Sequence, residues 1–92
     1  MQVDVELLVP YKHIAKTGHV RVDMERGNLE DLLANLVRQV PALRDHLSGE
    51  EFAGALPFLL MINRKVVAGR RPADIRINQG DCVTITQIMT GG

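Results

Sequence analysis

The chemistry that this sequence could carry lies at its end, where Thr90 is followed by Gly91 and Gly92. Glycine has no side chain, so two in succession let a backbone enter a narrow channel and place a carboxylate inside another protein. A carboxylate is a poor electrophile. Adenylation converts it to a mixed anhydride that a sulfur nucleophile can attack, which leaves a thiocarboxylate. We therefore expect Gly92 to be the reacting residue, with Gly91 and Thr90 threading it into a partner.

Two further groups of residues are candidates for partner binding. Ile88 and Met89 are apolar and stand between the last predicted strand and the glycines, where docking of the tail would bury them. Core packing is the alternative, because alternation alone places one of the two inward. The second group is a basic cluster, formed by Arg64, Lys65, Arg70 and Arg71. It is either a solvated surface or a patch that binds an acidic partner.

Catalytic and cofactor motifs are missing from the sequence. His13, His19 and His46 lack the i, i+4 spacing of a helical zinc site, and we interpret them as surface residues. The single cysteine, Cys82, excludes an intrachain disulfide and a cysteine metal cluster, and we expect a partly exposed, inert thiol. The sequence contains neither of the two common glycine-rich motifs that bind phosphate, GxGxxG and GxxxxGK followed by Ser or Thr. We therefore expect no bound metal, cofactor or nucleotide, and no catalytic residue in this chain.

Composition narrows the class of protein. Eleven basic and eleven acidic residues cancel, which argues against nucleic acid as the main partner. Hydrophobic residues make up 46% of the chain and charged residues 24%, as in an ordinary globular domain. No targeting segment is visible, and the longest apolar run, Phe58 to Ile62, is too short to cross a bilayer. We expect one domain over residues 1–92, with 90–92 as a flexible tail, in the cytoplasm and away from membranes.

Hydrophobic periodicity predicts the elements that position the tail. A first strand with one buried face is predicted where apolar residues alternate with acidic ones, at Val3, Val5, Leu7 and Val9. Pro10 should end it, and a turn at 16–19 should lead to a second strand at 20–24, forming a hairpin. A helix should begin after the N-cap Asn28, with Glu30 and Asp31 in its first turn, and end at Val40 before Pro41.

The second half of the chain predicts three more strands. Residues 58–62 are apolar on both faces, as in a sheet interior, and lead through a turn at 63–65 to a short strand at 66–68. A turn at 78–81 precedes the last strand, with Val83 and Ile85 inward. Leu43 and Leu47 are expected to pack beside the helix. The predicted fold is α+β: a mixed sheet of four to five strands with one main helix across one face.

Five short segments, in order along the chain, carry a resemblance to a known family: residues 15–18, 28–32, 61–63 and 80–85, and the final Gly91-Gly92. Together they resemble the MoaD/ThiS family of ubiquitin-like sulfur carriers over essentially the whole chain. Family members usually carry proline before the glycines, whereas this chain has Thr86-Gln87-Ile88-Met89-Thr90. The resemblance implies the β-grasp fold.

The resemblance also implies partners. An adenylating enzyme of the ubiquitin-activating type would use ATP on Gly92, and an acceptor enzyme would take sulfur from the thiocarboxylate. Chain length favours the small subunit of molybdopterin synthase, whose acceptor is the large subunit. The chain itself would be a cosubstrate. Four alternatives remain. The chain could be a carrier for thiamine, tRNA thiolation or cysteine synthesis, or a protein modifier that forms isopeptide bonds through Gly92. It could also be a plain binding module or a stand-alone enzyme.

Overall fold

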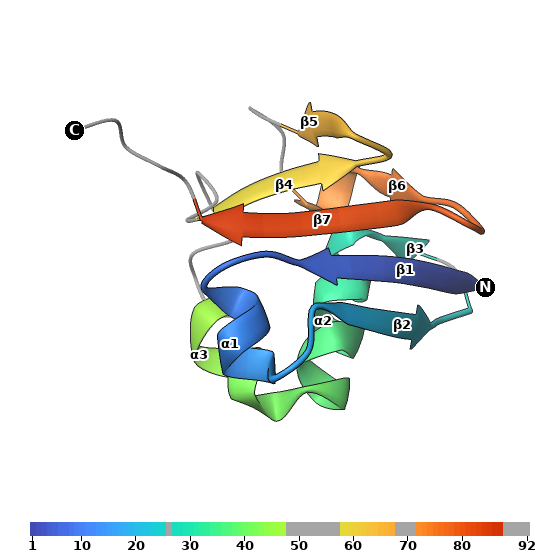
Figure 1. Cartoon of the computed structure of the whole chain (residues 1–92). Helices are drawn as coiled ribbons and strands as arrows, with labels where there is room; N and C mark the ends of the chain where they lie inside the picture. Colours follow the sequence, from blue (N-terminus) through green and yellow to red (C-terminus); the bar gives the residue numbers. More distant parts are fainter. Residues whose placement is uncertain (26, 48–57, 68–71, 88–92) are drawn as a thin grey trace.

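The computed structural model describes residues 1–25, 27–47, 58–67 and 72–87. Its main sheet has five strands in the order β2-β1-β7-β4-β5, and helix α2 (Leu29–Gln39) packs on one face of it (Figure 1). The strands of this sheet are β1 (Gln2–Leu7), β2 (His19–Asp23), β4 (Phe58–Ile62), β5 (Lys65–Val67) and β7 (Cys82–Gln87). The predicted mixed sheet with one main helix is confirmed.

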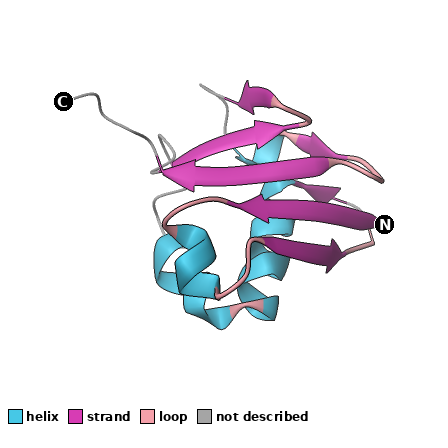
Figure 2. Cartoon of the chain, viewed as in Figure 1, coloured by secondary structure: helices cyan, strands magenta, loops and turns pink. Residues whose placement is uncertain are grey.

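The first and last strands are neighbours in the middle of the sheet. Strand β7 runs parallel to β1, with Val5 beside Val83, and antiparallel to β4, with Leu60 beside Ile85. Strands β2 and β5 pair antiparallel with β1 and β4 and form the two edges (Figure 2). As predicted, the strand at 58–62 lies in the interior of the sheet.

The core between sheet and helix is aliphatic. Alternation along β1 and β7 places every second residue inward, and the side chains of Val3, Val5, Val83 and Ile85 are fully buried. Helix α2 meets them with a stripe at helical spacing, whose buried members are Leu29, Leu32, Leu33, Leu36 and Val37. Leu43 and Leu47 complete the core from η1 (Pro41–Leu43) and α3 (Arg44–Leu47), as expected.

The start of α2 is defined by a reciprocal cap. The Asn28 side chain accepts a hydrogen bond from the Asp31 N–H (2.9 Å), and the Asp31 carboxylate accepts from the Asn28 N–H (3.2 Å). A Cβ at Gly27 would lie 2.3 Å from the Asp31 carboxylate, so only glycine leaves room for the cap. The last residue of the helix is Gln39, and its C-cap, Val40, directly precedes Pro41. Both predicted boundaries are confirmed.

Two local features differ from the sequence-based prediction. The first strand ends at Leu7 and not at Val9, and a short helix α1 (Tyr11–Ala15) stands where the hairpin connection was expected. Its left-handed C-cap is Lys16. In addition, β3 (Gly27–Asn28) and β6 (Arg76–Ile77) pair as a small second sheet after η3 (Pro72–Asp74), and neither strand was predicted.

Candidate functional site

The predicted tail starts from one end of the sheet. Strand β7 ends at Gln87, beside Phe58 at the start of β4, and its Ile85 lies beside Leu7 at the end of β1 (Figure 1). We call this the exit end of the sheet. The predicted tail residues, Gly92, Gly91, Thr90, Met89 and Ile88, lie outside the described residues, so the structure defines the base of the tail and not its course.

The base of the tail is firmly fixed to the globule. Val83 and Ile85 are fully buried, and Thr84 on the opposite face is 7% exposed. The Thr84 hydroxyl donates to the Glu6 carboxylate on the neighbouring strand (3.4 Å). Every buried side-chain nitrogen and oxygen in the described part of the chain has a hydrogen-bond partner. The strand that leads to the tail is therefore held in a defined position up to its end at Gln87.

Two exposed apolar residues lie beside that point. Leu8 is 37% and Val9 53% exposed, although both are large hydrophobic residues. The Leu8 N–H donates to the Ile85 carbonyl (2.9 Å), which holds this segment against the last strand. We call Leu8 and Val9 the exit rim. Sequence analysis missed the rim because it assigned both residues to the first strand, although the run Leu7-Leu8-Val9 breaks the alternation that defines that strand.

The two basic residues of the cluster that the structure describes, Arg64 and Lys65, are not near the exit end. Arg64 and Lys65 are exposed at the turn between β4 and β5, next to Ile62, which pairs with Val83 near the start of β7. The length of β7 separates this turn from the exit end by about 17 Å at the usual rise of a strand. Arg70 and Arg71 lie outside the described residues. The described half of the predicted basic cluster and the tail base thus form two separate surfaces.

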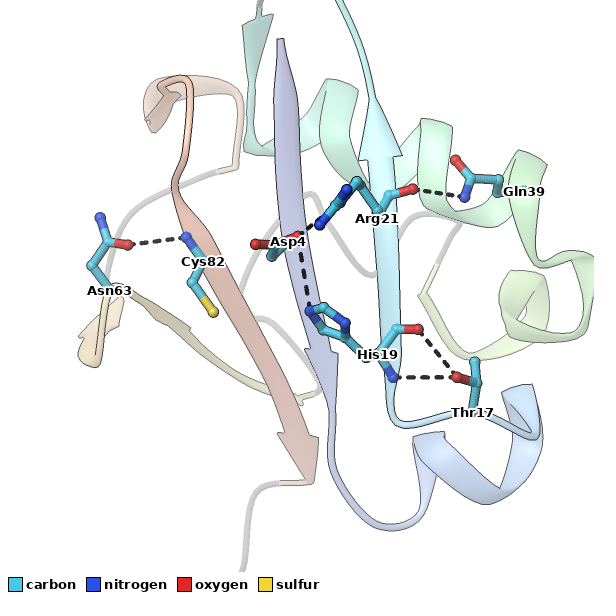
Figure 3. Close-up of polar contacts among 7 residues, drawn as sticks. All are labelled: Asp4, Thr17, His19, Arg21, Gln39, Asn63 and Cys82. Atoms are coloured by element: carbon cyan, nitrogen blue, oxygen red, sulfur yellow. Dashed lines mark hydrogen bonds and ion pairs between the residues drawn. The ribbon is translucent and has the colours of Figure 1, made fainter.

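Cys82 lies at the start of β7 on the exposed face of the sheet (Figure 3). Its neighbour on β1 is Asp4, whose carboxylate is 3.4 Å from the Arg21 Nε and 3.8 Å from the His19 Nε2. The Cys82 N–H donates to the Asn63 side-chain oxygen (3.0 Å). Within the described residues, no cluster of histidine, cysteine and acidic side chains could hold a metal ion. The predicted exposure of Cys82 is confirmed.

A cleft of about 630 Å³ lies far from the exit end, at the start of β1, where Met1, Asn28, Arg76 and Gln79 line it. It shares no lining residue with the tail base or the exit rim, so we do not assign it to the same site. None of the helices in the described part of the chain has the length and hydropathy of a membrane span.

Solved structures with the same fold as this chain were found by comparing structures. No family model matches the sequence, and no curated protein does either. SAMP1 from Haloferax volcanii superposes with a TM-score of 0.82 at 22% identity, covering 100% of both chains. The ubiquitin-like β-grasp is the fold of this chain. The resemblance to the MoaD/ThiS carriers is thereby confirmed at the level of the fold.

Two other β-grasp structures show how broad the likeness is. A chain from the complex of subunits 1 and 2 of the molybdopterin-converting factor from Helicobacter pylori superposes with a TM-score of 0.64 at 16% identity, covering 100% of both chains. Urm1 from Trypanosoma brucei gives 0.58 at 17% identity, covering 99% of this chain and 95% of its own. In the sequence of this β-grasp chain, three residues separate the end of β7 from Gly91-Gly92.

Proposed function

We propose that this chain is a sulfur carrier whose Gly92 carboxylate is adenylated and converted to a thiocarboxylate, which supplies sulfur for the synthesis of molybdopterin. One observation carries the proposal. On a β-grasp fold, the fixed central strand β7 ends at Gln87, five positions before the Gly92 that closes the Gly-Gly pair. Five residues of chain reach at most about 17 Å, so docking of the globule would bring Gly92 within that distance of the end of β7 and direct it into a partner's channel.

The chemistry assigns the reacting groups as follows. A Gly92 carboxylate oxygen attacks the α-phosphorus of ATP on the adenylating enzyme, and pyrophosphate leaves. A sulfide-level sulfur donor then attacks the acyl carbon, AMP leaves, and the thiocarboxylate remains. The acceptor enzyme takes that sulfur, and water restores the carboxylate. ATP belongs to the partner, and this chain is a cosubstrate with no bound cofactor of its own.

Exposed apolar residues beside the base of the tail form the proposed docking surface. The exit rim, Leu8 and Val9, places apolar area beside the base of the tail, where a partner that receives the tail would cover it. Ile88 and Met89 would extend this apolar contact along the tail. The Helicobacter pylori protein is a complex of subunits 1 and 2, which supports a large subunit as the acceptor partner here.

Intact mass tests the proposal directly. The protein is incubated with ATP, an adenylating enzyme of the ubiquitin-activating type and a sulfur source. We expect the mass to rise by one sulfur-for-oxygen exchange, mapped to the last peptide and trapped by a thiol alkylator. Deleting Gly92, or adding a residue after it, should abolish the exchange. Cys82→Ser should leave it intact, because the sulfur is never held on that side chain. Sulfur mapped to Cys82 would refute the proposal.

A protein modifier is the second candidate function. SAMP1 is a small archaeal modifier protein by name, and it superposes with the TM-score of 0.82 given above. In that case the activated Gly92 would be attacked by a lysine amine and an isopeptide bond would form. A ladder of conjugates that disappears on deletion of Gly92 would favour the modifier, and accumulation of the free thiocarboxylate without conjugates would favour the carrier.

A further inference from the structure

The two edges of the main sheet differ in whether another strand can pair with them. An edge strand presents backbone N–H and C=O groups that point away from its neighbour, and these can bind an extended segment of another chain. Strand β2 is one edge and β5 is the other. Which groups are free at each edge follows from the register of the pairing.

Side chains block the β2 edge at the backbone groups of His19 and at the Arg21 carbonyl. The Leu7 N–H donates to the Gly18 carbonyl, so the alternating residues His19 and Arg21 turn their own backbone groups outward. The Thr17 hydroxyl donates to the His19 carbonyl (3.1 Å) and accepts from the His19 N–H (3.3 Å). The Gln39 amide donates to the Arg21 carbonyl (2.9 Å) (Figure 3). An incoming strand would have to displace all three bonds.

The β5 edge is open by the same criterion. Asn63 and Arg64 have φ of 52° and 71°, the two left-handed residues of a tight hairpin turn, so Ile62 and Lys65 are the hydrogen-bonded closing pair. Val66 follows, and its N–H and C=O therefore point away from β4. No other described residue donates to or accepts from them. The Val66 side chain is 57% exposed on the same face as Met61.

The charges near the β5 edge indicate what kind of segment could pair with it. Arg64 and Lys65 directly precede Val66, are exposed, and form no ion pair with a described residue. Antiparallel pairing of two copies through β5 would bring these cations together, which disfavours a second copy of this chain. We propose that the β5 edge binds an extended acidic segment of a partner protein. The segment would pair with the Val66 backbone, set an apolar residue against its side chain and place carboxylates near the cations.

This proposal is independent of the tail chemistry, and a peptide titration tests it on the full chain. The probe is the peptide Asp-Asp-Val-Ile-Val-Asp-Asp, followed by amide chemical shifts in NMR. We expect the largest shifts at Val66 and its cross-strand partner Met61. A peptide with lysine in place of aspartate should bind at least about tenfold more weakly, because the charge contacts become repulsive. A peptide with proline at its centre should also lose binding, because it lacks the central donor.

Variants of the protein separate strand pairing from a general attraction of charge. Arg64→Asn with Lys65→Thr removes both cations while keeping residues suited to the turn and the strand, and it should weaken binding about fivefold to tenfold. Arg21→Gln, which neutralises an exposed cation beside the closed edge, should leave the affinity unchanged. Shifts centred on β2, equal binding of the proline peptide, or no binding at millimolar concentration would each overturn the proposal.

Discussion

Single residues decide where the main helix starts. Asn28 and Asp31 satisfy each other's backbone N–H groups, and Gly27 leaves the space that the Asp31 side chain needs. Asparagine before an apolar helical stripe was enough to predict the cap from sequence. The role of Gly27 was not predictable, because it depends on a side chain four residues later that folds back over the turn.

Removing the cap should cost stability without changing the fold. Asn28→Ala should lower the free energy of unfolding by about 1 kcal/mol, since a helix N–H loses its partner. Gly27→Ala should cost at least as much, because its Cβ would displace the Asp31 carboxylate. Urea denaturation followed by circular dichroism measures both changes.

The control for the cap is Glu30→Gln, an exposed change in the same turn that leaves both hydrogen bonds in place. It should shift stability by less than about 0.5 kcal/mol. If Asn28→Ala is no more destabilising than this control, the cap does not hold the helix start.

At the scale of helices and strands, the length of each element determined whether it could be predicted from the sequence. Helix α2 is long enough for its apolar period to be recognised, and Pro41 marks its end. Helix α1 has only five residues, and the strands β3 and β6 two each, so no period can form within them. Contacts between distant parts of the chain define these short elements, and a single sequence does not display those contacts.

Opening the β2 edge should make the protein self-associate. Thr17→Val with Gln39→Leu keeps side-chain size but removes the groups that occupy the His19 and Arg21 backbone. The freed edge can then pair with another copy. Sedimentation velocity should show dimers or larger species at concentrations where the parent is monomeric.

Thr17→Ser serves as the matched control, because serine keeps the hydroxyl that caps His19. It should sediment like the parent. A double variant that stays monomeric at high concentration would show that the two side chains are not what keeps this edge closed.

At the scale of the whole molecule, the tail and the rim are distinct parts of one proposed docking surface. The glycines could be recognised in the sequence because they are contiguous. The exit rim could not, because it exists only where β1 and β7 pair in parallel. The antiparallel pairing of β4 with β7 separates Arg64 and Lys65 from the exit end, although the sequence-based prediction counted them with the tail residues as partner contacts.

The rim should matter for the partner and not for folding. Leu8→Asp or Val9→Asp should weaken binding of the adenylating or acceptor enzyme about tenfold or more, because a charge would be buried against the partner. Thermal stability should change little, since both side chains are exposed. Calorimetric titration and melting curves on the same samples measure the two effects. Met89→Asp should behave in the same way if that residue docks with the rim.

Ala73→Asp gives the comparison for the rim, because it places the same charge on an exposed alanine of η3, away from the exit end. It should leave partner affinity unchanged. Equal losses of affinity and melting temperature in the Leu8 and Val9 variants would mean that the rim supports folding and not docking.

The position of β7 also bears on how the protein is made. Of the five strands in the main sheet, the central β7 comes last along the chain, and its neighbour β1 comes first. The core under this sheet therefore cannot close before β7 has been synthesised, because until then β1 and β4 have no strand between them. A prematurely terminated chain would stay open and exposed to proteases. Folding of the main sheet thus requires a chain that has been translated at least as far as β7.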